Sequence, residues 1–527
     1  MKKSLLLVPY MFCCLTLLWT EQYQIKNVVY NIDGRTKEYS LEKALNIDYN
    51  RIFTSEKELQ NYVAEIKQRL TDQRVLETGT VIYEVTGAYN SSDNTEIPQN
   101  TEETDGTGVT EDVQETSILP VTLHITAKDT WNIIPIPYPR YDSNTGVTLK
   151  IKVKDYNFLG SMSPLDFELL FLQEDEGKTN KIGAGIEFKV PFPLGIFHSY
   201  AGTDTNILYT IGADSPSFDM AGTFGISYDF GPVELKVDAK QIMTIDPEKR
   251  IYGDYIYGTE FVQLSAPIII LKTDTVAGNL VLTPLTSVTY NWDLDGMQDP
   301  DLVGPILDFG YNFTLGKVNW MGNFRRGFDV TFTQAYQYNF FKNDFDTRHS
   351  LKMEGYYNTK YVAFAARTEF FTHYNIITQQ FTTTSSMTEK LRGVFDAEEN
   401  NGGRGEQPIG FIFNFDMPIK VVQTDWCGWG EALFKKPMPS WFRIFDFELQ
   451  FAPFMDMALY KPSTGKFIDI VREGFYTVGG EIILYPNKMR SIQVRGSIGI
   501  DLSSRIFKQE WRTKRGPEIE VGIGLFY

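Results

Sequence analysis

The feature that most constrains this chain is a long alternation of nonpolar and polar residues, clearest over residues 328–340. Side chains of a β-strand point alternately to opposite faces, so this pattern predicts a strand with one nonpolar face. The run is longer than a soluble strand usually needs and matches a tilted membrane strand of about 9–11 residues. Its even-numbered positions are Phe328, Val330, Phe332, Gln334, Tyr336, Tyr338 and Phe340.

The same alternation recurs from about residue 147 to the end of the chain. Near its start, Leu149 and Ile151 alternate with lysines, and Phe167 and Leu169 follow with acidic residues between them. At roughly 24 residues per strand and loop, this part of the chain predicts about sixteen strands, an even number as in bacterial barrels. The predicted fold class is mainly β, a transmembrane antiparallel β-barrel.

Beyond residue 21 the sequence contains no nonpolar run of the roughly 20 residues that a membrane-spanning helix needs. The longest strictly nonpolar run, residues 266–271, is interrupted by Pro267. A chain of this kind that crosses a membrane must therefore close its strands into a barrel, so that every backbone group is hydrogen-bonded. The aromatic content of 14% suits the aromatic girdles of such a barrel, although a large soluble β-protein would look similar.

The first twenty residues predict a secretory signal peptide. Lys2 and Lys3 precede a largely nonpolar stretch that ends near residue 19. The small-residue pattern of a cleavage site is missing, and Cys13 and Cys14 leave lipidation open as an alternative. If residues 1–20 are removed, Cys427 is the only remaining cysteine, so no internal disulfide can form.

Residues 21–128 predict one small α+β domain. A strand over residues 23–32 is followed by a short helix from Ser40 and a longer helix from Ser55. Ser55 and Glu58 form a capping box, and strands follow at residues 80–85 and 121–126. The nonpolar stripe of the longer helix is Leu59, Tyr62, Val63, Ile66 and Leu70.

Residues 89–117 predict a disordered acidic insert between the last two strands of this domain. The segment carries Asp and Glu residues among Ser, Thr, Asn and Gly, with no Lys or Arg, so it buries too little to order itself. A calcium-binding loop is the alternative, although the acids lack the dense alternating spacing of a known loop type.

The last residues of the chain predict a further strand that ends on an aromatic residue. This looks like the C-terminal signature by which outer-membrane barrels are recognised during assembly, and a soluble edge strand is the alternative. The nonpolar members of the alternation are Ile519, Val521, Ile523, Leu525 and Tyr527.

A strand-helix-helix-strand-strand domain directly before a large barrel resembles the BamA/TamA outer-membrane assembly superfamily. The segment 129–137, Asp-Thr-Trp-Asn-Ile-Ile-Pro-Ile-Pro, is similar to that family's entry into the barrel, and Asp-Tyr-Asn-Phe-Leu-Gly at 155–160 is similar to its first hairpin. The resemblance implies one POTRA-like periplasmic domain over residues 21–128 and a barrel of the bacterial surface antigen type over residues 129–527, in the outer membrane.

The family also has an Arg-Gly pair at the tip of a loop that folds into the barrel lumen. Leu391-Arg392-Gly393-Val394 matches it, with an ordinary solvated loop as the alternative. The family pairs this arginine with acidic residues of neighbouring strands, which makes Asp456 the first candidate partner. A second family position, usually Glu, is Asn414 here, and Asp416 is the candidate that replaces it.

The resemblance implies a role in the assembly, insertion or translocation of outer-membrane proteins. The implied partners are unfolded outer-membrane or secreted polypeptides, membrane lipid and accessory assembly proteins. A two-partner-type secretion transporter and a passive porin are the alternatives. The net charge of −17 argues against nucleic acid. The four histidines are scattered and no nucleophile motif is present, so we expect no enzyme activity, metal or cofactor.

Overall fold

The computed structural model describes residues 21–85, 118–142, 146–174, 179–245, 256–273, 278–293, 305–382, 385–394, 405–461, 467–507, 509 and 517–523. The chain forms two compact units. Unit 1 contains the residues up to 31 together with 45–70 and 79–126, and unit 2 contains residues 32–44, 71–78 and 127–527. The predicted signal peptide (1–20) and acidic insert (89–117) lie outside the described residues.

The N-terminal elements build a four-stranded sheet in the order β2-β1-β4-β3 with two helices. A two-residue strand, β2, was not among the predicted elements; it pairs antiparallel with β1, with Tyr23 opposite Phe53. The order along the chain is β1 (Gln22–Asp33), α1 (Glu38–Leu45), β2 (Ile52–Phe53), α2 (Glu56–Asp72), β3 (Leu76–Val85) and β4 (Ile118–Asp129).

Helix α2 packs on the sheet through the predicted nonpolar stripe, whose five residues are all buried. Its N-terminus is capped by Ser55, whose hydroxyl accepts from the backbone N–H of Glu58 at 3.3 Å. The Glu58 carboxylate accepts in return from the N–H of Thr54, one residue earlier than the predicted capping box would have it, at 2.9 Å. Within the described ranges, no helix is both long and nonpolar enough to span a membrane.

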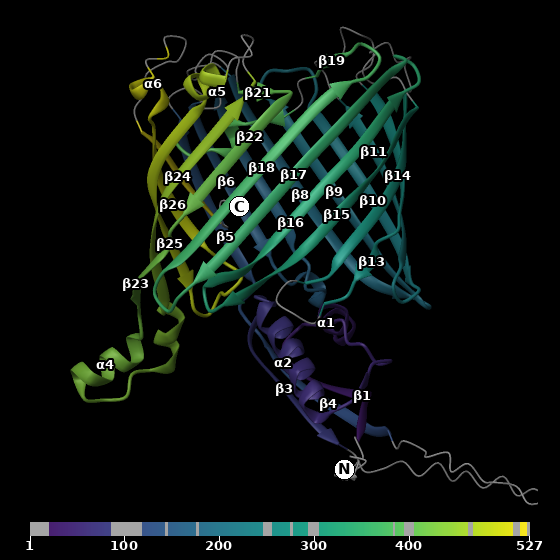
Figure 1. Ribbon diagram of the computed structural model, residues 1–527. Coiled ribbons are helices and arrows are strands. Elements are labelled where there is room, and N and C mark those ends of the chain that lie inside the picture. Colours follow the sequence, from purple (N-terminus) through teal and green to yellow (C-terminus); the bar gives the residue numbers. More distant parts are fainter. Residues whose placement is uncertain are drawn as a thin grey trace, which may run out of the picture. The chain divides into compact units, whose positions relative to one another are not determined.

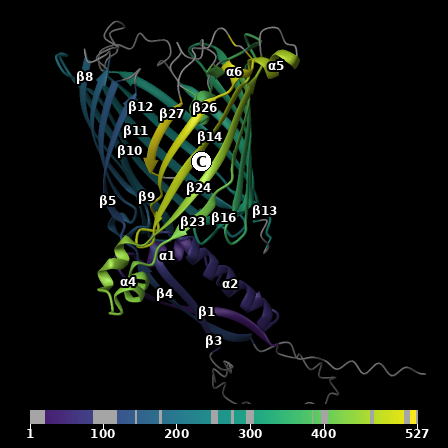
Figure 2. The same ribbon diagram turned by 90° about the vertical axis from the view of Figure 1, so that its left-hand side faces the viewer.

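The strands of unit 2 pair antiparallel into a closed barrel (Figures 1 and 2). Strand β16 contains most of the alternating segment that we take as the clearest sequence signal. The strands are β5 (Ile133–Asp142), β6 (Gly146–Asp155), β7 (Leu165–Glu174), β8 (Thr179–Leu194), β9 (Phe197–Thr210), β10 (Ser217–Asp229), β11 (Glu234–Ile245), β12 (Ile256–Ser265), β13 (Ile268–Leu271), β14 (Leu280–Asp293), β15 (Ile306–Met321), β16 (Phe324–Asn339), β17 (Asp344–Asn358), β18 (Ala363–Asn375), β19 (Gln380–Phe381), β22 (Ile409–Asp416), β23 (Ile419–Gln423), β24 (Phe447–Tyr460), β25 (Phe475–Pro486), β26 (Val494–Asp501) and β27 (Glu518–Ile523).

Some of these segments are pieces of one interrupted strand. Segments β12 and β13 both pair with β14, β22 and β23 both pair with β24, and β19 and β22 both pair with β18. Joining these pieces reduces the 21 segments of the closed order to 18 strands in the described part of the chain. The sequence estimate of about sixteen was too low because several turns are tight: β8 ends at Leu194 and β9 begins at Phe197.

The barrel presents nonpolar side chains on its outside. In β24, alternate residues from Glu448 to Tyr460 are buried, whereas Phe451 and Met455 between them are exposed. A nonpolar exterior on strands that are hydrogen-bonded all round matches the requirements of a lipid bilayer. Other large exposed nonpolar residues on the strands include Leu149, Ile151, Phe167, Leu169, Phe224, Val237, Val262, Val288, Phe309 and Phe370.

Candidate functional site

A loop leaves the barrel wall between β19 and β22. Both segments pair with β18, so the residues between them are an insertion into one interrupted strand. In its described part, β20 (Ser385–Ser386) pairs with β21 (Glu406–Gln407), and the 3-10 helix η4 (Thr388–Lys390) leads directly into Leu391. The predicted motif, residues 391–394, therefore forms a compact turn directly after η4.

Nonpolar side chains seat this turn against the barrel wall. Met387, Leu391 and Val394 are buried in one cluster with side chains of β18, β22, β24 and β25. Removing nonpolar surface from water is worth about 25 cal/mol per Å² and holds the turn against the buried face of these strands. The wall residues of the cluster are Phe371, Ile412, Ala458, Tyr460 and Phe475.

Arg392 is the centre of an ionic cluster inside the barrel. Its Nε and Nη2 atoms donate to the two carboxylate oxygens of Asp456 at 2.9 and 2.7 Å, and its backbone N–H donates to Asp456 at 2.9 Å. Nη1 donates to Glu481 at 3.1 Å. Nη2 also forms an ion pair with Asp416 at 2.7 Å. One guanidinium therefore holds three carboxylates.

Both members of the central pair are removed from water: the side chains of Arg392 and Asp456 are 1% and 0% exposed. Burying an ion costs several kcal/mol, which only complete pairing and hydrogen bonding offsets. The two parallel bonds to Asp456 use the fork of the guanidinium, and its carbon lies 3.8 Å from the centre of the Phe454 ring, a cation–π contact. Loss of Arg392 would leave three carboxylates without their common partner.

The carboxylates come from three adjacent strands: Asp416 ends β22, Asp456 lies within β24 and Glu481 lies within β25. The structure thus places both sequence candidates, Asp456 and Asp416, at Arg392. Asn414 stands opposite Asp456 in the sheet, and its Nδ2 donates to the carbonyl of Lys390 at 2.9 Å, so it binds the loop backbone. Glu481 was not predicted as a partner of Arg392. The sequence feature that could have indicated it is a single acidic residue on the lumen-facing side of a mostly nonpolar strand.

Gly393 joins the loop to the last two strands of the chain. Its N–H donates to the carboxylate of Glu518 in β27 at 2.6 Å. It adopts a positive φ of 85°, and a Cβ added to it would lie 2.8 Å from the carbonyl carbon of Gly499 in β26. Residues 391–394 therefore contact five strands: β22, β24, β25, β26 and β27.

Of the C-terminal signature residues, Ile519, Val521 and Ile523 lie within the described ranges. Ile519 and Val521 are exposed, whereas Glu518 and Glu520 alternate with them on the lumen side. Ile523 is the last residue of β27, and Leu525 and Tyr527 lie outside the described residues. Another Arg-Gly pair of the sequence, Arg495-Gly496, belongs to strand β26, where Arg495 pairs with Glu520 at 2.7 Å, so this pair is part of the wall.

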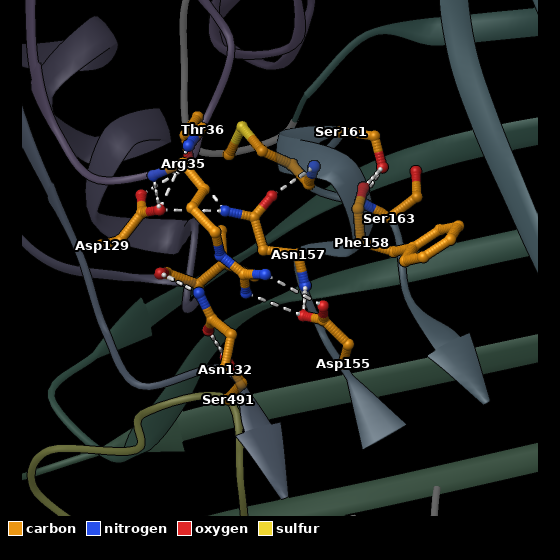
Figure 3. A network of polar contacts seen from close by, with 12 residues as sticks. Arg35, Thr36, Asp129, Asn132, Asp155, Asn157, Phe158, Ser161, Ser163 and Ser491 are labelled. Carbon is orange, nitrogen blue, oxygen red and sulfur yellow. Dashed lines mark hydrogen bonds and ion pairs between the residues drawn. The ribbon is translucent and has the colours of Figure 1, made fainter. Parts of the chain in front are cut away.

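A second polar network connects the two segments that resemble the family's barrel entry and first hairpin, residues 129–137 and 155–160 (Figure 3). The Asp129 carboxylate accepts from the backbone N–H groups of Arg35 and Thr36 at 2.7 and 3.1 Å and from the Thr36 hydroxyl at 2.6 Å. Asn157 Nδ2 donates to Asp129 at 3.2 Å and to the Thr36 hydroxyl oxygen at 2.7 Å. The entry motif and the first hairpin motif are thus linked directly.

Asn157 is fully buried at the centre of this network. Its backbone N–H donates to Asp155 at 3.0 Å, and its side-chain oxygen accepts from the N–H of Met162 at 2.8 Å. The Arg35 guanidinium lies 3.3 Å from Asp155. Buried polar groups that are all satisfied fix one geometry. The network therefore fixes the turn between β6 and β7 to residues 35–36 of the same unit.

No cluster of His, Cys, Asp or Glu in the described ranges is arranged to hold a metal ion. The charged groups in the lumen are instead arranged as ion pairs, in which Arg392 occupies the position between carboxylates. These ion pairs attach the loop to the barrel wall.

The sequence matches no known family model and no curated protein. Among solved structures, the chain is similar to CdiB from Acinetobacter baumannii, with 12% identity over 92% of this chain and 71% of that chain and a TM-score of 0.41. It is similar to CdiB from Escherichia coli, with 7% identity, 98% and 93% coverage and a TM-score of 0.38. It is also similar to BamA from Haemophilus ducreyi lacking POTRA domains 1–3, with 11% identity, 94% and 98% coverage and a TM-score of 0.32. Because every TM-score is below 0.5, the functional proposal rests on the contacts within the chain.

Proposed function

We propose that this chain is an outer-membrane β-barrel protein that acts in the assembly, insertion or translocation of outer-membrane proteins, with a POTRA-like domain over residues 21–128 in the periplasm. It is not an enzyme: its work is mechanical, the holding and release of protein segments. The nonpolar exterior of the barrel supports a position in lipid. The acidic chain, with its net charge of −17, supports polypeptide rather than nucleic-acid clients.

The observation that carries the proposal is the pairing of Arg392 with the buried carboxylates of Asp456 and Glu481 and with the partly buried Asp416. Desolvating an arginine in the lumen costs several kcal/mol unless it is fully paired, so this pairing supports a loop that is held at one place on the wall. A loop held by ionic contacts stays inside the barrel and is released when those contacts exchange with others. Gly393 extends the same attachment to Glu518 in β27. In the closed order β27 is the neighbour of β5, so the loop is tied to the strand at which the barrel closes.

The N-terminal sheet supports client binding. In the described part of the chain, β3 is the end strand of the order β2-β1-β4-β3. An end strand has backbone N–H and C=O groups available for an added strand, which is the basis of β-augmentation. Ile82 on β3 is 64% exposed and would contact the side chains of a bound extended segment. This mode of binding is sequence-tolerant, as an insertion factor with several clients requires.

Depletion of the protein in its own host, followed by quantitative mass spectrometry of the outer membrane, tests the proposal. We expect several unrelated barrel proteins to decrease together and to recover with the wild-type chain. Loss of a single secreted protein would instead indicate a two-partner-type transporter. An unchanged outer-membrane proteome, together with a large steady conductance of the purified protein in planar bilayers, would identify a passive porin and refute the proposal.

A further inference from the structure

Residues 424–446 form a helical hairpin that leaves the barrel between β23 and β24. It consists of α4 (Trp426–Phe434) and the 3-10 helix η5 (Ser440–Phe445), and its two arms contact one another. Figures 1 and 2 show α4 beyond the end of β23. Cys427 and Gly430 face the second arm, with Cys427 Sγ 3.7 Å from the carbonyl of Pro439. The contacts described above for Arg392 and for Asn157 do not involve residues of this hairpin.

The base of the hairpin is fixed to the barrel wall. Three hydrogen bonds join Thr424 and Phe447: the N–H and hydroxyl of Thr424 donate to the carbonyl of Phe447 at 2.9 and 3.2 Å, and the N–H of Phe447 donates to the Thr424 hydroxyl oxygen at 2.7 Å. Asp446 accepts from the N–H of Trp426 at 2.8 Å through its side chain and from the N–H of Asn487 at 2.8 Å through its carbonyl. Asp425 caps α4 by accepting from the N–H of Gly428 at 2.9 Å. These bonds set the direction in which the hairpin leaves the barrel.

The outer face of the hairpin is strongly nonpolar. Trp426, Trp429 and Leu433 stand at positions i, i+3 and i+7 of α4, on one face of the helix, and all three are exposed, Leu433 by 75%. The second arm and the helix end add the exposed aromatic residues Phe434, Trp441 and Phe445. A contiguous nonpolar surface of this kind marks a contact with a membrane or a partner.

The position and charge of the hairpin favour lipid. It connects β23 to β24, whose exposed residues Val421 and Phe451 belong to the nonpolar exterior of the barrel. The exposed basic residues Lys435, Lys436 and Arg443 lie at the turn and on the second arm. Of the three acids, Asp425 and Asp446 accept from backbone N–H groups at the base, and the exposed Glu431 lies on the face of α4 opposite Trp429 and Leu433.

We propose that residues 424–446 lie in the membrane interface beside the barrel, with the nonpolar face among acyl chains and the basic side chains at lipid phosphates. Tryptophan and basic residues are enriched in such interfacial segments, which bind through buried nonpolar area and attraction to anionic lipid. This inference rests on the proposed position of the barrel in a membrane. The hairpin then anchors one side of the barrel end at which β23 finishes and β24 begins.

Nitroxide labels in nanodiscs of phosphatidylethanolamine and phosphatidylglycerol test the inference. Single cysteines are placed at Leu433→Cys and at Glu431→Cys in the full chain with Cys13, Cys14 and Cys427 replaced by alanine. Position 431 lies on the opposite face of α4 and is the matched control. Met455→Cys, on the outward face of β24, reports whether the barrel itself is in lipid. Trp441→Cys is a second reporter if the Leu433 variant does not fold.

We expect the ratio of oxygen to nickel-chelate accessibility to be several-fold higher at position 433 than at position 431, and to be high at position 455. Equal ratios at 433 and 431, with position 455 in lipid, would overturn the hairpin inference and leave the proposed function intact. A low ratio at 455 would refute the position of the barrel in the membrane. Protection of position 433 that appears only when a second protein is added would also overturn the inference and identify a protein partner.

Discussion

Gly393 of the lumen loop and Gly499 of β26 touch backbone to backbone. A Cβ added to Gly393 would lie 2.8 Å from the carbonyl carbon of Gly499, and one added to Gly499 would lie 2.7 Å from the Cα of Gly393. No real Cβ tolerates such distances, so neither position accepts a side chain without movement of the loop or the strand. This contact places Arg392 at the depth where it reaches Asp456.

Gly393→Ala should release the loop although every charged residue remains. The added methyl group clashes with β26, and φ of 85° is strained for alanine, which together cost on the order of 1–3 kcal/mol. Limited proteolysis of the loop in detergent-solubilised protein measures this release. Gly355→Ala in β17 is the control, because a Cβ there meets nothing within 4 Å. Equal proteolysis of the two variants would show that the contact between the two glycines does not hold the loop.

Asn157→Ala should loosen the junction network. The substitution removes the bonds to Asp129, Thr36 and Met162 and leaves buried groups without partners, at a cost of about 1–3 kcal/mol. Hydrogen exchange of peptides covering residues 33–37 and 155–163 should become faster in both peptides together. Asn50→Ala, at an exposed position of unit 1, is the control and should leave both peptides unchanged. Faster exchange in one peptide only would contradict a shared network.

The N-terminus of α2 should be destabilised by acid. The backbone N–H of Thr54 and the guanidinium of Arg51 lower the pKa of Glu58 below its ordinary value of 4.5. Because the pKa is lower in the folded chain, the stabilisation is complete above pH 4.5 and is lost as the pH falls through the folded value. Hydrogen exchange of α2 amides, corrected for intrinsic rates, should show easier opening at pH 4 and below than at pH 7. Glu58→Gln should remove this dependence, and an unchanged dependence would contradict the role of Glu58.

Local periodicity was enough to predict α2 and β16. The stripe of α2 and the alternation within β16 both depend on neighbours a few residues away, and both have the predicted form in the structure. The strand number depends on turn lengths, and turns such as the one between Leu194 and Phe197 leave little trace in a nonpolar pattern. The hairpin was missed because it interrupts the alternation, although it holds Trp426, Trp429 and Trp441 of the eight tryptophans.

The ionic cluster was predicted in part. The family resemblance indicated two of its carboxylates, and the third is placed by the register of the strands. Asp456 and Asp416 were proposed because their local sequences resemble strands that carry the partners of the loop arginine. Glu481 reaches Arg392 because β24 and β25 align so that Ala452 stands opposite Glu481, two inward-facing positions along β24 from Asp456. The register of β24 against β25 depends on the geometry of the segment that connects them, which the sequence analysis did not predict, so the third carboxylate was missed.

The most direct test of the account is a double-mutant cycle with Arg392→Ala and Asp456→Asn. The reporter is Val394→Cys, a buried position whose alkylation by a membrane-impermeant maleimide measures the free energy of loop opening. Each single change breaks a buried ion pair and should lower that free energy on the order of 3–5 kcal/mol, with the barrel still folded by its heat-dependent gel mobility. Because both changes break the same contact, the account predicts that the double variant loses clearly less than the sum of the two singles. Additive losses, or an Arg392→Ala variant whose loop opens no more readily than wild type, would contradict it.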